Sequence, residues 1–222
     1  LAHAQELGEM LNAAYTDDLL DINMEADIYL LAVNDAAITE LNDQLRLGKR
    51  IVAHTAGAVS LDAISRISTH TGVLYPLQSI RKEIKTYPPI PVMLEASSDE
   101  VLRRLQALAQ SISGSVTVTN SEQRLKYHLT AVLCNNFTNH LIAQAKAYCE
   151  KEQLDFALLQ PIIKETFDRL EKYAPETVQT GPAMRQDETT MSLHRELLTD
   201  NPYLQQVYRV MSEAIYRFHN NS

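Results

Sequence analysis

The sequence predicts an α/β domain followed by an all-α domain. Up to residue 120, short apolar runs alternate with helical patterns, which is typical of a mostly parallel sheet covered by helices. After residue 120 no further strand is predicted, and the apolar residues recur with a helical period. We therefore expect two domains, residues 1–120 and residues 121–222.

The first domain contains five predicted strands. The first strand, residues 26–33 (ADIYLLAV), is a nearly continuous apolar run, which favours burial on both faces of a sheet. The other strands are predicted at residues 51–53, 72–78, 88–95 and 115–119. Helices are predicted at residues 2–13, 36–45, 60–67 and 100–111.

The second domain is predicted to consist of helices alone. The longest, residues 121–152, has no Pro or Gly, and its apolar residues point in many directions around the axis, as in a buried helix. Pro161 should kink or interrupt a second helix at residues 156–172. Two more helices are expected at residues 188–198 and 202–219, after an irregular stretch at 174–187.

The composition excludes several classes of protein. The chain has 20 basic and 28 acidic residues, a net charge of −8 and no basic block, which argues against nucleic acid and anionic membranes as partners. No apolar run of about 18 residues and no signal-peptide pattern is present, so we expect a cytoplasmic protein without a transmembrane helix. Cys134 and Cys149 would lie roughly 22 Å apart along one helix, too far for a disulfide.

One row of polar residues lies on the longest predicted helix. His128, Asn135 and Asn139 are seven and eleven residues apart, so a regular helix places them nearly in line on one face. If they are buried, these side chains need hydrogen-bond partners. Two interpretations remain open: a polar patch at a helix–helix or dimer contact, or a face that contacts a substrate.

The ends of the predicted strands supply a second group of candidate residues. In open parallel sheets, ligands bind at the carboxyl ends of the strands. Polar and small residues follow three of the strands: Asn34 and Asp35; His54, Thr55 and Gly57; Tyr75 and Gln78. Gly57 would let the backbone approach a ligand closely. The alternative is that these are ordinary strand-exit loops, which favour the same residue types.

The segment 179–187 (QTGPAMRQD) joins two predicted helices. Arg185 could pair with Asp187 or hold an anionic ligand through both guanidinium nitrogens, and Asp187 could instead cap the next helix. Other chemistries lack their motifs: the sequence has no metal-ligand spacing of His or Cys, no GxSxG and no GxGxxG.

Several motifs, taken together, resemble a known family. They are ADIYLLAVND (26–35), HTAG (54–57), YPLQ (75–78), CNNFTNH (134–140) and QTGPA (179–183) with Arg185 and Asp187. In this order they resemble bacterial Rossmann-like proteins with an uncharacterised helical C-terminal domain. That family is similar to NADP-dependent reductases, and its remote relatives are pyrroline-5-carboxylate reductase, ketopantoate reductase, and the 6-phosphogluconate and β-hydroxyacid dehydrogenases.

The resemblance implies a fold and an activity. It implies a Rossmann-like dinucleotide-binding domain, then a homodimerising helical domain of the 6-phosphogluconate dehydrogenase C-terminal type, with the active site in the cleft between them. The implied reaction is hydride transfer between NADP, or alternatively NAD, and a small carbonyl, imine or alcohol substrate.

The resemblance also implies roles for the candidate residues. Asn34, Asp35, His54, Thr55 and Gly57 would bind the cofactor. Tyr75, Gln78, Gln179, Thr180 and Arg185 would bind the substrate. His128, Asn135 and Asn139 would be catalytic, with His128 as proton donor because imidazoles titrate near neutral pH. No metal is expected.

The sequence departs from the family pattern in two places. The family opens with a strand and a glycine-rich turn of the GxGNxA kind, and this sequence starts after them, at Leu1. The β-hydroxyacid dehydrogenases have a Lys four residues before an Asn, but Ala131 stands four residues before Asn135 here. The missing lysine keeps a second class open, a dinucleotide-binding or dimeric scaffold protein without turnover.

Overall fold

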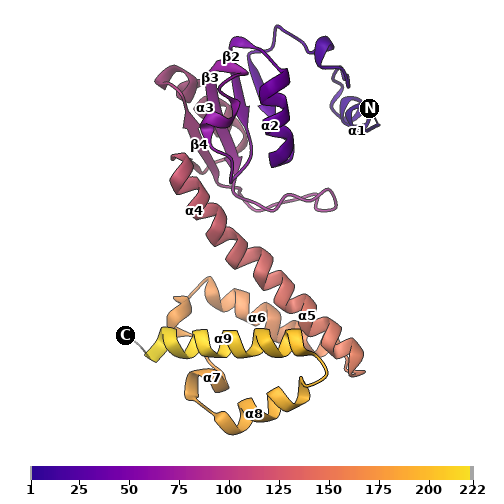
Figure 1. Ribbon diagram of the computed structural model, residues 1–222, viewed down its shortest axis with the longest axis vertical. Helices are drawn as coiled ribbons and strands as arrows, with labels where there is room; N and C mark the ends of the chain where they lie inside the picture. The colour runs from indigo at the N-terminus through magenta and orange to yellow at the C-terminus, as the bar shows by residue number, and fades with distance from the viewer. Residues whose placement is uncertain (1, 221–222) are drawn as a thin grey trace. The chain divides into compact units, whose positions relative to one another are not determined.

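A computed structural model describes residues 2–220 and divides the chain into two compact units, Leu1–Asn136 and Phe137–Ser222 (Figure 1). The first unit contains a β-sheet, and the second is built of helices. The predicted fold class, a Rossmann-like α/β domain followed by a helical domain, is confirmed. The domain boundary at residue 120 stays a prediction, because the division between the compact units falls inside the helical segment that begins at Ser121.

A five-stranded sheet forms the centre of the first unit. Its strands, in spatial order, are β1 (Ile28–Leu31), β2 (Gly48–His54), β3 (Ser68–Pro76), β4 (Val92–Ala96) and β5 (Val116–Val118). Strands β1, β2 and β3 run parallel, β4 runs antiparallel to β3, and β5 is parallel to β4. The carboxyl ends of β1, β2 and β3 therefore meet at one edge of the sheet.

Helices cover both faces of this sheet. The helical elements before β5 are α1 (Ala2–Leu11), α2 (Asp35–Gln44) and α3 (Asp99–Ile112), with the short turns η1 (Leu19–Asp21) and η2 (Leu61–Ile64), and of these α2 and α3 cover opposite faces of the sheet. Val52 packs with Ile38 of α2 on one face, and Leu74 packs with Leu105 of α3 on the other. Gly72 lies directly against α3, since a Cβ there would come within 2.2 Å of Leu105.

The first strand is less buried than the sequence predicted. β1 lies at the edge of the sheet, and its Leu30 side chain is 46% exposed although the neighbouring Leu31 is buried. Because successive side chains of a strand point to opposite faces, Leu31 reaches the core that contains α2 and Leu30 does not. The expectation of burial on both faces is wrong for Leu30.

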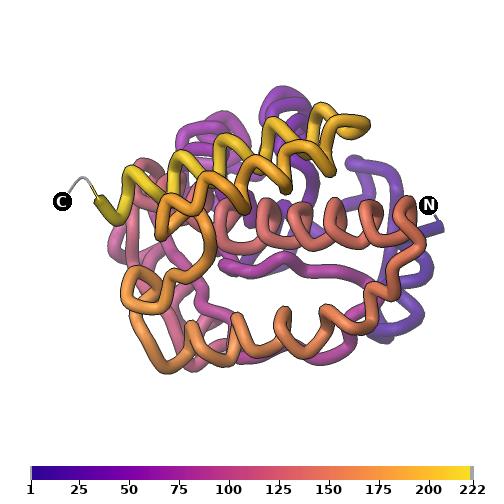
Figure 2. Tube along the Cα trace, turned by 90° about the horizontal axis from the view of Figure 1, so that it is seen from below, coloured from indigo at the N-terminus to yellow at the C-terminus, as the bar shows by residue number. Residues whose placement is uncertain are grey.

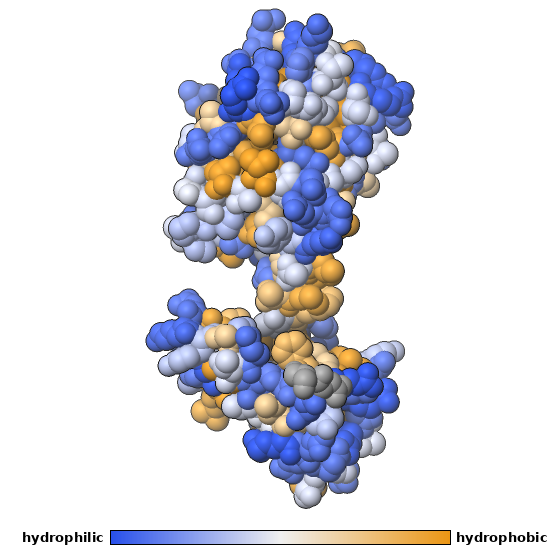
Figure 3. Space-filling view, turned by 90° about the vertical axis from the view of Figure 1, so that its left-hand side faces the viewer, coloured by the Kyte–Doolittle hydropathy of each residue, from blue (hydrophilic) through white to orange (hydrophobic). Residues whose placement is uncertain are grey.

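The long predicted helix is present, but it is neither regular nor buried. Helix α4 (Ser121–Ala131) leads into a π-helical segment, η3 (Val132–Phe137), and then into α5 (Thr138–Lys151). Four large apolar side chains along it are between 49% and 57% exposed: Leu125, Leu129, Leu133 and Phe137. Figure 3 shows one face of the molecule with its hydrophobic residues in orange. An apolar helix surface need not be covered by its own chain.

The second unit contains α5 and the remaining helical elements. These are η4 (Phe156–Leu159), α6 (Gln160–Leu170), η5 (Pro175–Thr177), α7 (Pro182–Arg185), α8 (Glu188–Leu197) and α9 (Pro202–Asn220). Figure 2 shows α5 between α6 and α9 across the view. Pro161 lies in the first turn of α6, where it starts a helix and does not kink one. None of the described helices is long and apolar enough to cross a membrane.

Candidate functional site

A cavity of about 450 Å³ lies at the carboxyl end of β3 and beside the junction of α4 and η3. All of its lining residues belong to the first unit. They are Tyr75, Leu77, Gln78 and Ser79 from the end of β3 and its exit loop, and His128, Ala131, Val132, Cys134, Asn135 and Asn136 from the helix. Four sequence-predicted site residues, Tyr75, Gln78, His128 and Asn135, therefore meet around one cavity.

Tyr75 and His128 form a polar pair in the wall of this cavity. The Tyr75 hydroxyl lies 3.1 Å from Nδ1 of His128, and the two rings meet edge to face with their centroids 6.2 Å apart. Burial raises the pKa of the Tyr75 hydroxyl, although the positive charge of Arg124 acts in the opposite direction. The phenol therefore keeps its proton near neutral pH and can donate a hydrogen bond.

Gly57 is packed against both members of this pair. A Cβ at position 57 would lie 2.7 Å from Nδ1 of His128 and 2.9 Å from Cζ of Tyr75. The loop after β2 thus touches the imidazole and the phenol so closely that only glycine fits without a shift. The sequence suggested that Gly57 admits a ligand, and in the structure its close neighbours are these two side chains.

His54 holds the same loop from inside the unit. Its side chain is fully buried, the Ala56 amide donates to Nδ1 at 3.2 Å, and Nε2 lies 3.2 Å from the carbonyl oxygen of Ser60. Burial, and then the charge of Arg124, lower the pKa of His54. A neutral imidazole with its proton on Nε2 satisfies both partners. Both ring nitrogens are therefore engaged by the loop itself, and the cofactor contact predicted for His54 stays a prediction.

A buried ion pair connects α4 to the sheet. Arg124 is 1% exposed, and its guanidinium donates to the carboxylate of Glu95 on β4 and to the carbonyl oxygen of Val59. Ser121 adds a hydrogen bond of 2.8 Å to the same carboxylate. Sequence reasoning missed this network. Its signal is the spacing of Arg124 and His128, because residues four apart share one face of a helix.

The π-helical segment η3 forms another wall of the cavity. A π-helix forms i to i+5 hydrogen bonds, so its side chains change register relative to an α-helix, and such segments are frequent at functional sites. Asn135 and Asn136 of η3 line the cavity, whereas Asn139 belongs to α5 and is exposed. The straight row of His128, Asn135 and Asn139 assumed a regular helix, and that assumption is wrong.

The remaining candidates at the sheet edge support local structure. The Asn34 side chain caps α2 by accepting a hydrogen bond of 2.9 Å from the Ala37 amide, and Asp35 is the first residue of that helix. The Thr55 amide donates to the carbonyl oxygen of Leu31, which joins the ends of β2 and β1. Asn34 and Asp35 are exposed, so their side chains are accessible to a ligand.

The candidates of segment 179–187 lie in the second unit. Gln179 donates to the carbonyl oxygen of Thr180 at 2.9 Å, and Arg185 is exposed at the end of α7. Asp187 caps α8, accepting hydrogen bonds of 3.1 and 2.8 Å from the amide and hydroxyl of Thr190, and these hydrogen bonds lower its pKa. The helix-cap interpretation of Asp187 is confirmed.

The edge of the sheet at the carboxyl ends of β1 to β3 offers polar groups, and ligands bind at this place in such sheets. The start of α2 is a poor phosphate site, because Asn34 already caps it and Asp35 places a negative charge in its first turn. The sequence holds no glycine-rich phosphate turn, and residues 2–220 contain no cluster that could hold a metal ion.

A family model described as a domain of unknown function (DUF2520) matches residues 90–215, more than half of the chain. The chain belongs to the DUF2520 family. No match was found among the curated proteins.

Solved structures extend the likeness to nearly the whole chain. A Bacteroides fragilis protein named "putative NADP oxidoreductase" is 36% identical, with a TM-score of 0.89 over 96% of this chain and 84% of that chain. A 1-pyrroline-5-carboxylate reductase from Streptococcus pyogenes is 16% identical, with a TM-score of 0.57 over 97% of this chain and 86% of that chain. An imine reductase from Myxococcus stipitatus in complex with NADP+ is 13% identical, with a TM-score of 0.60 over 99% and 82%.

The identity to the Bacteroides fragilis protein is high enough to indicate a family relationship. The likeness to the two reductases shows a common fold. Together they confirm the sequence-based resemblance to Rossmann-like NADP oxidoreductases with a helical C-terminal domain.

Proposed function

We propose that the chain is an NAD(P)-dependent oxidoreductase that transfers hydride to or from a small carbonyl, imine or alcohol substrate. The observation that carries the proposal is the cavity where Tyr75, Gln78, His128 and Asn135 meet. The 36% identity to a protein named as an NADP oxidoreductase supports the cofactor class. The reductases that share the fold support a C=N substrate.

The residues around the cavity divide the chemical work. A bound nicotinamide supplies or accepts the hydride. The amides of Gln78 and Asn135 can orient the substrate, and His128 exchanges a proton with its oxygen or nitrogen. Leu77 and Val132 supply an apolar part of the wall. None of the described lining residues carries a carboxylate, an ammonium or a guanidinium group. This lack of charge favours a substrate whose reacting end is uncharged.

NADP is the proposed cofactor, with NAD as the alternative. Asn34, Asp35, Thr55 and Gly57 lie at the sheet edge and are proposed to line the nicotinamide side, with His54 supporting their loop. The test is titration of NADPH and NADH, by fluorescence and calorimetry, into the purified protein. Saturable binding of NADPH or NADH supports the proposal. Failure to bind either cofactor overturns it.

The proton-transfer role of His128 can be tested by substitution. In NADPH-oxidation assays over a panel of small imines, aldehydes and ketones, we expect His128→Asn to lower turnover about 100-fold, within the usual range for a general acid–base residue. The NADPH affinity of His128→Asn should stay within about twofold of the wild-type value, because His128 is proposed to act in proton transfer and not in cofactor binding. His140→Asn, an exposed histidine on α5, is the matched control. Full turnover by His128→Asn would remove the role.

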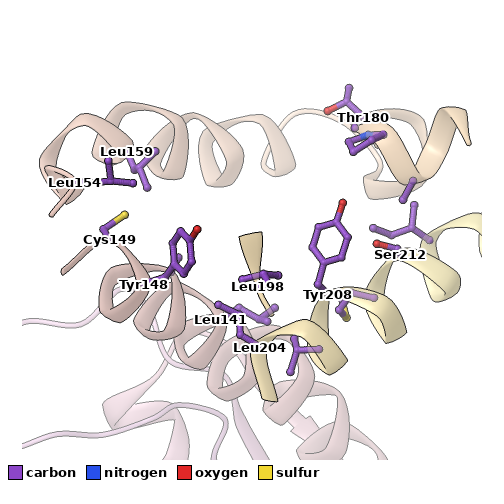
Figure 4. Close-up of a pocket in the computed structure, with 17 residues that line it drawn as sticks. Leu141, Tyr148, Cys149, Leu154, Leu159, Thr180, Leu198, Leu204, Tyr208 and Ser212 are labelled. Carbon is purple, nitrogen blue, oxygen red and sulfur yellow. The ribbon is translucent and has the colours of Figure 1, made fainter. Parts of the chain in front are cut away.

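The second unit is proposed to form a homodimer. Among its described residues, four apolar side chains are buried, Cys149, Ala183, Met191 and Leu198. Independent small domains usually bury about 60% of the surface that the unfolded chain exposes. The helices also surround an apolar cavity of about 590 Å³, into which the rings of Tyr148 and Tyr208 project (Figure 4). A second copy of this unit is the proposed cover, since most soluble oligomers are symmetric homo-oligomers.

A non-catalytic dinucleotide-binding or dimeric scaffold is the second candidate function. The β-hydroxyacid dehydrogenases have a lysine four residues before an asparagine, and here Ala131 stands four residues before Asn135. The absence of that lysine favours the non-catalytic candidate. Cofactor binding without turnover of any member of the substrate panel would support the scaffold. Turnover would exclude it.

A further inference from the structure

We propose that Tyr75 holds His128 as the tautomer with its proton on Nε2, and resupplies a proton to Nδ1 when the Nε2 proton leaves. Tyr75 is then a positioning residue, and Nε2 is the atom that exchanges the proton with the substrate. The inference rests on the proposed function for the use of His128. The tautomer itself does not depend on it.

The Nδ1 side of the His128 ring is closed. The Tyr75 hydroxyl lies 3.1 Å from Nδ1, and the backbone at Gly57 is so near that a Cβ there would come within 2.7 Å of Nδ1 and 2.9 Å of Cγ. No substrate atom fits between these groups. Nε2 has no hydrogen-bond partner among residues 2–220, and His128 lines the cavity. Nε2 is therefore the nitrogen that can meet a substrate.

The direction of the hydrogen bond follows from the groups available. Tyr75 is 8% exposed, and within the described part of the chain its hydroxyl has no hydrogen-bond partner other than His128. If Nδ1 carried the proton and donated it, the phenol hydrogen would have no acceptor among residues 2–220, and a donor left without a protein partner is costly. If the phenol donates, Nδ1 is the acceptor, and a neutral imidazole then carries its proton on Nε2.

This arrangement permits a balanced proton transfer. A neutral imidazole that loses its only N–H proton would become a strongly basic anion. Here, a carbonyl that receives hydride at carbon takes the Nε2 proton at oxygen, while the Tyr75 hydroxyl proton moves to Nδ1. The C=O π pair becomes the new O–H bond, His128 stays neutral, and Tyr75 becomes a phenolate that water later reprotonates. Burial raises the Tyr75 pKa, and the positive charge of Arg124 acts against that rise, so the phenolate readily takes its proton back from water.

The tautomer can be measured without any substrate. In the wild-type protein above neutral pH, ¹⁵N NMR of the imidazole should show an unprotonated Nδ1 and a protonated Nε2 for His128, identified by loss of its signals in His128→Asn. In Tyr75→Phe, part of the population should shift to the Nδ1-protonated form. Tyr127→Phe is the control, because Tyr127 is an exposed tyrosine on α4, the helix that carries His128. This variant should match the wild type.

Two outcomes overturn the inference: a protonated Nδ1 in the wild type, or an unchanged tautomer ratio in folded Tyr75→Phe. A second readout is kinetic. Tyr75→Phe should lose about 100-fold in turnover while its NADPH affinity stays within about twofold. If the protein binds neither NADPH nor NADH, the proposed function falls and the tautomer assignment is still decided by NMR. If turnover is present and the ratio is unchanged, only the inference falls.

Discussion

His54 and Gly57 act on one short loop, residues 55–60, which closes the carboxyl end of β2. His54 holds the loop through the Ala56 amide and the Ser60 carbonyl, and Gly57 lets the loop reach the Tyr75–His128 pair. A histidine at the end of a strand and a glycine three residues later therefore both contribute to the contact between this loop and the His128 ring.

The contact at Gly57 predicts a selective effect of one added methyl group. Gly57→Ala should force the loop or the His128 ring to move, which costs about 1–3 kcal/mol of unfolding free energy, as overpacking usually does. Urea denaturation and the His128 NMR signals measure the two effects. Gly114→Ala is the control, because a Cβ at position 114 would meet nothing within 4 Å. Equal behaviour of both variants would contradict the contact.

The buried His54 predicts a pH-dependent stability. Its pKa is lowered in the folded protein, so the unfolded chain, with a histidine pKa of about 6.5, takes up a proton first as the pH falls. The free energy of unfolding should therefore decrease below about pH 6.5, by at most about 1.4 kcal/mol per pH unit for this single group. The decrease should be smaller in His54→Gln than in the wild type when urea unfolding is measured across that range. His3→Gln, an exposed site, should keep the wild-type slope.

Among the elements, α4 is attached to the sheet by polar contacts, of which the buried Arg124–Glu95 ion pair is the charged one. Arg124 donates to Glu95 on β4 and to the loop at Val59, one helical turn before His128. The same helix exposes Leu125 and Leu129 on other sides, so apolar packing on its own chain does little to hold it. An electrostatic anchor therefore holds the helical turn that precedes His128.

Removal of one partner of that anchor should destabilise the first unit. Arg124→Met leaves the Glu95 carboxylate, which is 15% exposed, without its counter-ion, and such a change costs about 3–5 kcal/mol in buried pairs. Lys126→Met is the matched control, because its pair with Glu122 is exposed and contributes less than about 1 kcal/mol. Urea unfolding followed by far-UV circular dichroism compares them. A loss in Arg124→Met no larger than in the control would refute the anchor.

At the scale of the molecule, the two units differ in how they bury apolar surface. The sheet of the first unit has continuous apolar clusters on both faces. The helical unit buries few apolar side chains by itself and leaves Leu158, Ile162 and Phe218 more than half exposed. This difference motivates the proposed homodimer.

One substitution in the apolar cavity tests the dimer. Met211 lines the cavity and is 43% exposed, so Met211→Glu should place a charge in the covered surface and shift the protein to monomers in sedimentation or light-scattering measurements. Gln206→Glu adds the same charge on an exposed part of α9 that does not line this cavity, and it should leave the dimer intact. A monomeric wild-type protein at micromolar concentration would reject the proposal.

The sequence by itself determined the order of strands and helices, because apolar periodicity and capping residues are local properties. It also placed Tyr75, Gln78, His128 and Asn135 among the site candidates. It did not determine the π-helical segment, the Arg124–Glu95 pair or the contact of Gly57 with His128, since each arises between residues distant in sequence or from a change of helical register. Burial was the least predictable property. The sequence shows that Leu129 is apolar and would gain free energy by burial. Only the tertiary structure shows that the described chain leaves this side chain exposed.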